Sequence, residues 1–426
     1  MENKIRRVVV TGMGAVTPIG NNVNECFENM KNGVHGIAPI TQFDTTDFKA
    51  KLAAEVKNFD PRTYMEKSDV LRSDKYAQFA MGAACQAVEE SRIVGTVNPD
   101  RFGVYFGSGI GGIQTFEIEH KKLLEKGSRR VSPLFVPMMI SNMAAGMIAI
   151  RFDCRGAAMP SVTACASGSN AIGEALRAIR HGYLDAVITG GAEAAISASG
   201  VAGFINMQAL SVSEDPDSAS LPFDLRRGGF VIGEGAGALV LEEYEHAKAR
   251  GAKIYGEVCG YGSTCDAYHI TAPRSDAEGG AKAMIEALRE AGYDGKETVY
   301  INAHGTGTPM NDSLETLAIK KSLGEEEAKK AYVSSTKSMT GHMLGAAGAI
   351  EAIACLKALE EGVLPPTVGL KETDPACDLN YIPNQAICAE VELALSNSLG
   401  FGGHNACLAF RKMKNETERK ESITNE

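Results

Sequence analysis

The chain has 426 residues, of which 44% are hydrophobic and 23% are charged, a balance typical of a folded globular protein and not of a disordered or fibrous one. The formal net charge is −10, and no long basic run offsets it, so nonspecific binding to nucleic acid is not expected. No stretch is apolar enough to cross a bilayer, so we expect no membrane insertion.

The ten cysteines are scattered along the chain, without a C-x-x-C pair or the Cys and His spacing of a zinc site. We therefore expect free thiols, no bound metal and a location in the reducing cytoplasm. The length allows two or three domain-sized units.

Strand-like apolar runs alternate with helix-like periodic segments along the chain, which predicts an α/β fold with a buried sheet. Strands are predicted at residues 7–10, 103–106, 186–189, 238–241, 299–303, 332–334 and 406–410. Helices are predicted near residues 70–92, 168–182, 277–292, 312–322 and 344–361. A strand that passes into a helix at residues 234–251 is expected to join two halves of the chain. Residues 413–426 are expected to form a flexible tail.

One cysteine lies in a run of small residues, Val162–Gly168, directly before a helix-like segment. The apolar positions that follow recur at helical spacing, so Cys165 is predicted to lie near a helix N-terminus. The unpaired N–H groups and the helix dipole there favour a thiolate, so we expect the pKa of Cys165 to be lowered from about 8.5. Such a thiol is a nucleophile; the alternative is a small buried side chain without a chemical role.

Two histidines occur in glycine-rich or turn-forming segments that follow strand-like runs. His304 begins the segment His304–Pro309 (HGTGTP), and His342 ends the segment Ser334–His342 (SSTKSMTGH). Together with Cys165 they supply one thiol and two imidazoles. This combination indicates chemistry on thioesters.

Eight segments, in this order along the chain, resemble the β-ketoacyl-acyl-carrier-protein synthases, and most closely the type II condensing enzyme of dissociated fatty-acid synthesis. The segments are Val8–Gly20, Gly107–Gly112, Val162–Gly168, Gly190–Ala194, Pro222–Gly237, His304–Pro309, Ser334–Gly348 and Asn397–Asn405. The resemblance covers nearly the whole chain. It implies a homodimer with a thiolase-like five-layered αβαβα fold of two duplicated halves: residues 1–250 carry the nucleophile, and residues 251–412 carry both histidines.

The activity implied by this resemblance is decarboxylative Claisen condensation of an acyl thioester with malonyl-acyl-carrier protein in fatty-acid elongation. No cofactor is implied, because the substrates arrive on the phosphopantetheine arm of acyl carrier protein. Cys165 is then the acylated nucleophile, and His304 and His342 face the malonyl thioester. The N–H groups of Cys165 and Phe401 are the implied donors to the tetrahedral oxyanion, and Phe401 also gates access to the cysteine.

The resemblance assigns supporting roles to further polar residues. Lys337 is placed with Cys165, His304 and His342 among the catalytic residues and is expected to pair with Glu351, with Asp312 as a further partner. The sequence leaves open a chemical or a structural role for Lys337, and structural support is the role we expect. Thr306 and Thr308 are expected to form hydrogen bonds to the phosphopantetheine arm.

The acyl pocket and the carrier-protein contact are also assigned. Ile110 falls where the type II enzymes place a bulky side chain across the acyl pocket, so it is expected to influence chain length. Because acyl carrier protein is acidic, a local basic patch must receive it. Lys67, Arg129 and Arg130 are the candidates for that patch.

Two residues depart from the family pattern: Gly307 stands where a serine is frequent, and His404 where a threonine is common. Both positions are in loops, so local contacts are expected to differ more than the chemistry. A polyketide ketosynthase, which also carries HGTGTP, is the main alternative. A degradative thiolase acting on coenzyme A esters would have a second cysteine near the C-terminus, where this chain has Phe401 and His404. A noncatalytic chain-length subunit would lack Cys165.

Overall fold

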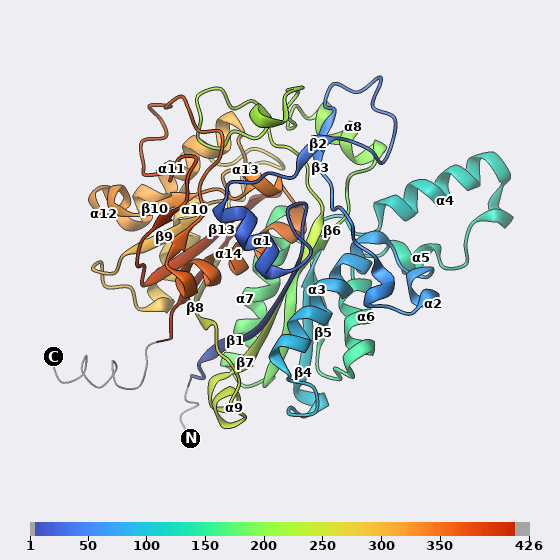
Figure 1. The fold of residues 1–426 in the computed structure, drawn as a ribbon, viewed down its shortest axis with the longest axis horizontal. Coiled ribbons are helices and arrows are strands. Elements are labelled where there is room, and N and C mark those ends of the chain that lie inside the picture. Colours follow the sequence, from blue (N-terminus) through green and yellow to red (C-terminus); the bar gives the residue numbers. More distant parts are fainter. Residues whose placement is uncertain (1–4, 414–426) are drawn as a thin grey trace.

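Ten strands form one continuous sheet in the computed structural model, which describes residues 5–413 (Figure 1). Their order across the sheet is β10-β9-β13-β14-β8-β1-β7-β6-β4-β5. The N-terminal strands are β1 (Val8–Val16), β4 (Phe102–Gly107), β5 (Ala158–Ser161), β6 (Ala186–Glu193) and β7 (Gly235–Glu243). The C-terminal strands are β8 (Gly256–Cys265), β9 (Val299–Asn302), β10 (Tyr332–Ser334), β13 (Leu393–Gly400) and β14 (His404–Arg411). The predicted tail lies outside the described residues from residue 414 onward.

The two sets of five strands have the same topology. When the five strands of each set are numbered by their order in the sequence, they lie across the sheet in the order 3-2-4-5-1. This order is β5-β4-β6-β7-β1 in the N-terminal set and β10-β9-β13-β14-β8 in the C-terminal set. The third and fourth strands run parallel to the second, whereas the fifth runs antiparallel to the fourth and the first. The sets join through a short antiparallel contact of β1 with β8, in which Val9 is opposite Glu257 and Val10 opposite Gly256. This repetition is the expected duplication.

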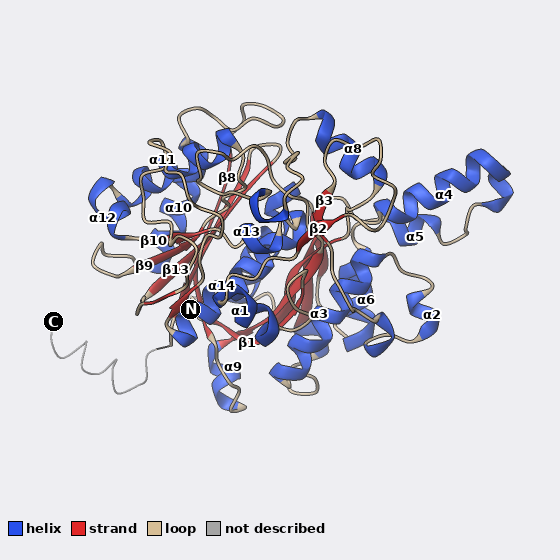
Figure 2. Ribbon diagram, turned by 45° about the horizontal axis from the view of Figure 1, so that its top comes forward, coloured by secondary structure: helices blue, strands red, loops and turns tan. Residues whose placement is uncertain are grey.

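Helices cover both sets of strands and also fill the space between them. α7 (Ser167–Arg180) and α14 (Ala347–Glu361) contact each other and lie between the two groups of strands (Figure 1). Figure 2 shows α14 between the two groups of strands. α3 (Lys75–Ser91) packs on the outer face of the N-terminal set, and α10 (Glu278–Ala291) packs on the outer face of the C-terminal set. The result is five layers, αβαβα, as the resemblance implied.

The seven predicted strands and five predicted helices are all present. Three further strands of the sheet were not predicted: β8 and β13 are rich in glycine or polar residues, and β5 is short and mostly exposed. The remaining strands are β2 (Ile37–Pro39), β3 (Leu52–Ala54), β11 (Val363–Leu364) and β12 (Ile387–Cys388). The remaining α-helices are α1 (Val23–Lys31), α2 (Lys67–Val70), α4 (Ile113–Lys126), α5 (Phe135–Met139), α6 (Met143–Phe152), α8 (Ala198–Asn206), α9 (Tyr244–Ala249), α11 (Pro309–Leu323), α12 (Glu325–Lys330) and α13 (Lys337–Thr340). Between residues 5 and 413, no helix has the combined length and apolar character needed to cross a membrane.

Candidate active site

The cysteine predicted to be the nucleophile lies in a tight turn that leads into α7. Cys165 is the middle residue of the 3₁₀ turn η4 (Ala164–Ala166), and Ala164 has a φ of 51°, in the left-handed region that is uncommon for alanine. The turn is stabilised by the Ser167 hydroxyl, which donates to the Ala164 carbonyl at 2.6 Å and accepts from the Thr163 N–H at 2.9 Å. The turn therefore holds Cys165 at a fixed position at the start of a central helix.

The expected lowering of the Cys165 pKa is wrong. The side chain is buried, and burial raises the pKa of the Cys165 thiol to about 12, although the Lys337 ammonium and the N–H groups of Phe401 and Cys165 act in the opposite direction. The helix N-terminus stabilises a thiolate, but removal of water costs the thiolate more. In the free protein Cys165 is a neutral thiol.

Both predicted histidines face this thiol from the C-terminal half. His304 follows β9, and His342 follows α13. Their ring centroids are 5.2 Å apart with an interplanar angle of 86°. The Cys165 Sγ and one ring nitrogen from each histidine lie within 4.8 Å of one another. The structure thus brings together the three residues that sequence placed in separate segments.

The surroundings of both histidine rings favour the neutral form, and a backbone hydrogen bond fixes the tautomer of His342. The Leu344 N–H donates to Nδ1 of His342 at 3.3 Å, which places the proton of the neutral ring on Nε2. Within residues 5–413, Nε2 of His342 and Nδ1 of His304 are buried and have no hydrogen-bond partner. Burial, with the Lys337 charge nearby, lowers the pKa of both imidazoles well below 6.5.

A thiol and two imidazoles this close could also bind a metal ion. A histidine that ligates a metal usually donates its other ring N–H to an acceptor. In His342 the other nitrogen, Nδ1, is itself an acceptor from the backbone. The surroundings therefore favour donation from Nε2 to a substrate oxygen over ligation of a metal.

A second backbone segment approaches the thiol from the end of β13. The N–H groups of Cys165 and Phe401 both interact with the Cys165 sulfur. This approach requires Gly400: a Cβ at that position would lie 2.8 Å from the Thr163 carbonyl oxygen and 3.3 Å from the Cys165 nitrogen. The structure thus places the two N–H groups expected to be oxyanion donors beside the Cys165 sulfur.

Lys337 is buried and forms an ion pair with Glu351. The expected pairing with Asp312 is not seen. The Asp312 carboxylate instead accepts from the N–H of Phe223 at 2.7 Å and of Gly307 at 3.2 Å. Asp312 therefore supports the loop that follows His304.

That loop carries the two threonines assigned to the phosphopantetheine arm. Their hydroxyls lie 3.0 Å apart, with Thr306 buried and Thr308 partly exposed. Arg227, itself buried, donates to the carbonyls of Thr308 at 3.2 Å and Pro309 at 3.0 Å. The position of the threonines is thus fixed by Asp312 on one side and Arg227 on the other.

The residues predicted for the pocket and for docking lie at the surface. Ile110 is 38% exposed, in a turn after β4 that packs against the nucleophile turn: a Cβ on Gly109 would lie 3.2 Å from the Ala164 carbonyl oxygen. Lys67 is exposed in α2. Arg129 and Arg130 are exposed in the 3₁₀ turn η3 (Ser128–Arg130), at the tip of an arm formed by α4 and α5 that extends away from the sheet (Figure 1).

Two buried glutamates near the site were missed. Glu315 of α11 accepts from the N–H groups of His304 and Gly305, each at 2.7 Å, and so fixes the backbone of one histidine. Glu193 of β6 lies in the quoted segment Gly190–Ala194, but no role was assigned to it. An acidic residue at the end of an apolar strand was the available signal for Glu193; Glu315 had none.

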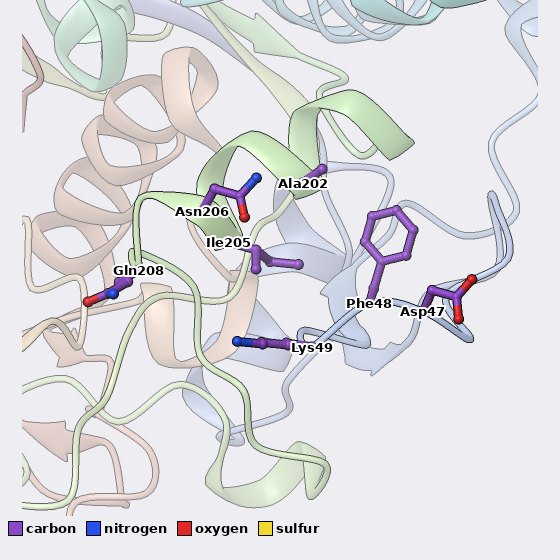
Figure 3. Close-up of a pocket in the computed structure, with 7 residues that line it drawn as sticks. All are labelled: Asp47, Phe48, Lys49, Ala202, Ile205, Asn206 and Gln208. Atoms are coloured by element: carbon purple, nitrogen blue, oxygen red, sulfur yellow. The ribbon is translucent and has the colours of Figure 1, made fainter.

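A separate surface pocket lies between residues 47–49 and α8 (Figure 3). Its lining contains none of the three reactive residues. Phe48 and Ile205, which line it, pack on the same apolar cluster that contains Cys165. The pocket and Cys165 therefore border the same apolar cluster.

Comparisons with known proteins agree with this geometry. Residues 5–247 match the family of β-ketoacyl synthase N-terminal domains, and residues 255–371 match the family of the C-terminal domains. The 3-oxoacyl-[acyl-carrier-protein] synthase 2 of Synechocystis sp. (strain ATCC 27184 / PCC 6803 / Kazusa) is 50% identical over 409 residues, 96% of this chain and 98% of the relative. The protein of the same name from Staphylococcus aureus (strain COL) is 50% identical over 410 residues, 96% of this chain and 99% of the relative.

Solved structures that are similar to this chain include ketosynthases. The ishigamide ketosynthase/chain length factor has a TM-score of 0.90 and 36% identity, and a β-ketoacyl synthase from Burkholderia phymatum STM815 has 0.89 and 36%. A ketosynthase in complex with its type II polyketide acyl-carrier protein has a TM-score of 0.89 and 35% identity. Each comparison covers 96% of this chain and 100% of the other. The chain belongs to the β-ketoacyl synthase family.

Proposed function

We propose that this protein is a 3-oxoacyl-[acyl-carrier-protein] synthase that elongates fatty acids by decarboxylative Claisen condensation. The observation that carries the proposal is the convergence of Cys165, His304 and His342 within 4.8 Å in a buried site. The name of the relatives that are 50% identical over 96% of the chain supports the same activity. The nucleophile belongs to residues 1–250 and both histidines to residues 251–412.

In the first half-reaction, the Cys165 sulfur attacks the carbonyl carbon of an acyl thioester on the carrier protein. The tetrahedral oxyanion accepts hydrogen bonds from the N–H groups of Cys165 and Phe401. The bond from carbon to the carrier sulfur then breaks, and the proton lost by the thiol leaves with the phosphopantetheine thiol. Because burial raises the pKa of the thiol, we propose that the proton leaves the sulfur as the attack proceeds.

In the second half-reaction, malonyl-carrier protein replaces the released thiol. Its carboxylate leaves as carbon dioxide, and the electron pair passes to an enolate whose oxygen accepts from the imidazoles of His304 and His342. The enolate carbon attacks the acyl carbon on Cys165. A carbon–carbon bond forms and the carbon–sulfur bond breaks, which releases Cys165 as a thiolate. The thiolate takes up a proton from solvent, and the thiol is restored.

Carrier protein is the partner that this chemistry requires. Thr306 and Thr308 present hydroxyls for the phosphopantetheine arm, and Lys67, Arg129 and Arg130 offer exposed positive charge to an acidic carrier. The solved complex of a related ketosynthase with its acyl-carrier protein supports this mode of delivery. The ten free cysteines suit a cytoplasmic location.

A homodimer would cover the apolar surface around β5. This strand is at the edge of the sheet and largely exposed, so its outer backbone groups are free to pair with another strand. Exposed apolar side chains continue from β5 onto the arm and α6: Ile118, Leu124, Val136, Ile150, Met159 and Val162. A Met159→Glu variant that remains dimeric by analytical ultracentrifugation would contradict this interface.

The experiment that tests the function is intact-protein mass spectrometry after treatment with acyl carrier protein. The wild-type protein should gain one acyl group and then convert it, with malonyl-carrier protein, to a 3-oxoacyl product. Cys165→Ala should gain none but retain part of the malonyl decarboxylation, because the histidine donors do not depend on the thiol. A stoichiometric adduct on Cys165→Ala would refute the assignment.

A polyketide ketosynthase is the second candidate, favoured by the structural likeness to such enzymes at 35–36% identity. The same experiment distinguishes the two. A carrier-bound product with one new 3-oxo group identifies fatty-acid elongation. Repeated condensation without reduction would identify polyketide synthesis.

A further inference from the structure

One buried carboxylate has no part in the chemistry described above. Glu193, at the end of β6, is 0% exposed. One carboxylate oxygen accepts from the Ser108 hydroxyl at 3.1 Å and the Ile110 N–H at 3.2 Å. The other accepts from the N–H groups of Gly109 at 2.8 Å and Gly345 at 3.1 Å. All four partners are donors.

These donors come from two separate parts of the site. Residues 108–110 form the turn that carries Ile110, the side chain assigned to the acyl pocket. Gly345 belongs to the 3₁₀ turn η6 (Leu344–Ala346), whose first N–H donates to Nδ1 of His342. Glu193 therefore binds both the acyl-pocket turn and the turn that orients a catalytic imidazole.

The duplication of the fold explains why this place can hold an anion. The turn η6 before α14 corresponds to η4 before α7, and Leu344 has a φ of 46° where Ala164 has 51°. Gly345 thus corresponds to Cys165. The Cys165 N–H is available to a substrate oxyanion, whereas the Gly345 N–H is already bound to the carboxylate of Glu193.

We propose that Glu193 is a positioning residue: a built-in anion that fills the second copy of the oxyanion turn and thereby fixes His342 and Ile110 in their working positions. The roles of His342 and Ile110 in this inference rest on the proposed function. Glu193 itself touches neither the thiol nor the imidazoles in a hydrogen bond.

The four donors also explain why a carboxylate is needed and an amide would fail. Burial raises the pKa of Glu193 to about 7, and the hydrogen bonds from residues 109, 345, 110 and 108 act in the opposite direction. In Glu193→Gln, an NH₂ group would replace one oxygen and face N–H donors. Because one oxygen accepts from both Gly109 and Gly345, an NH₂ group in its place would remove an anchor from each of the two turns.

The test uses the full-length protein with Glu193→Gln and measures three rates. Release of carbon dioxide from malonyl-carrier protein should fall about 10- to 100-fold, the typical cost of a misplaced catalytic group. The ratio of Cys165 acylation rates for long and short acyl chains should change. Alkylation of Cys165 by iodoacetamide should be at least as fast as in the wild type, because the Glu193 charge raises the pKa of that thiol. General damage to the fold would not produce this combination.

Glu242→Gln is the matched control. Glu242 is also 0% exposed and lies at the opposite end of β7, where it accepts from Thr11 and Arg250. The Glu242→Gln variant should be less stable than the wild type, but its ratio of acylation rates for long and short acyl chains should not change. If it changes decarboxylation and the ratio as Glu193→Gln does, the proposal is wrong.

Ser108→Ala removes only one of the four donors and keeps the test open if Glu193→Gln does not fold. It should change the chain-length ratio while decarboxylation stays within about twofold of wild type, since the Gly345 contact remains. An unchanged ratio in Ser108→Ala, or wild-type decarboxylation in folded Glu193→Gln, would overturn the proposal. Absence of condensation by the wild type would instead refute the proposed function. The comparison of Cys165 alkylation rates between Glu193→Gln and the wild type needs no substrate, so it would still test the effect of Glu193 on the thiol.

Discussion

The close approach of Gly400 to the nucleophile turn gives a sharp prediction for the first half-reaction. In Gly400→Ala the new Cβ would lie 2.8 Å from the Thr163 carbonyl oxygen, closer than carbon and oxygen can remain. Relief of this overlap requires the end of β13 to move by roughly half an ångström, which draws the Phe401 N–H away from the sulfur. The backbone of Gly400 is not in the left-handed region, so the methyl group would act through this steric overlap and not through backbone strain.

Loss of one preorganised oxyanion donor costs about 10²–10³ in rate, or about 2.7–4 kcal/mol. Acylation of Cys165, measured by rapid quench in a single turnover with acyl-carrier protein, should therefore fall by this factor. Decarboxylation of malonyl-carrier protein should change little, because it depends on His304 and His342.

Gly280→Ala is the control for a methyl group placed against the same strand. Its Cβ would meet Leu399 at 3.4 Å and Ala318 at 3.5 Å, which are ordinary contacts. This variant should acylate like the wild type. If Gly400→Ala also acylates at the wild-type rate, the Phe401 N–H is not an oxyanion donor.

Three further predictions concern charge. The rate of Cys165 alkylation by iodoacetamide should rise about tenfold per pH unit from about pH 7 to 10, because a pKa raised to about 12 leaves the thiolate a minor species throughout. A plateau by neutral pH would show that the helix N-terminus has a larger effect on this pKa than burial. Lys337→Met and Glu351→Gln should each lower the free energy of unfolding by about 3–5 kcal/mol in chemical denaturation, because each change leaves a buried partner unpaired. The double variant should lose less stability than the sum of the two single losses. Additive losses would contradict the pairing. Replacement of Arg129 and Arg130 by glutamate should raise KM for carrier-bound substrate more than KM for a pantetheine-linked mimic, and added salt should weaken carrier binding. Equal effects on the two KM values would show that these arginines do not bind the carrier protein.

The order of layers could be predicted because buried strands and amphipathic helices carry strong apolar patterns. The strands that were missed have weak patterns for definite reasons. β8 contains glycines at positions where a Cβ would strike the backbone of α10, as at Gly260 and Gly262. β13 carries Ser396 and Ser398, which are fully buried yet polar. A polar or glycine-rich sequence can be a central strand when neighbouring layers, and not its own side chains, determine the burial.

The three residues that converge in the structure could be named from sequence, but their electrostatics could not. A motif places Cys165 at a helix start, and the structure agrees, yet only the fold shows that this start is buried between two layers. In the same way, Asp312 looked like a partner for Lys337, because sequence does not show that two backbone N–H groups lie closer to it. Glu193 was missed because its donors come from residues 108–110 and 345, which only the duplicated fold brings together.

Burial has opposite effects on the pKa values of the two kinds of reacting group, and the two effects have one consequence. It keeps Cys165 protonated and keeps His304 and His342 unprotonated, so none of the three carries charge before substrate enters. Negative charge then develops first on the oxyanion and later on the enolate. In each case it meets fixed N–H dipoles that need no reorganisation, in surroundings where water cannot screen them. The site therefore stabilises the negative charge that develops on each oxygen more than it stabilises the neutral carbonyl from which that oxygen comes. This difference accelerates the reaction and does not only tighten binding.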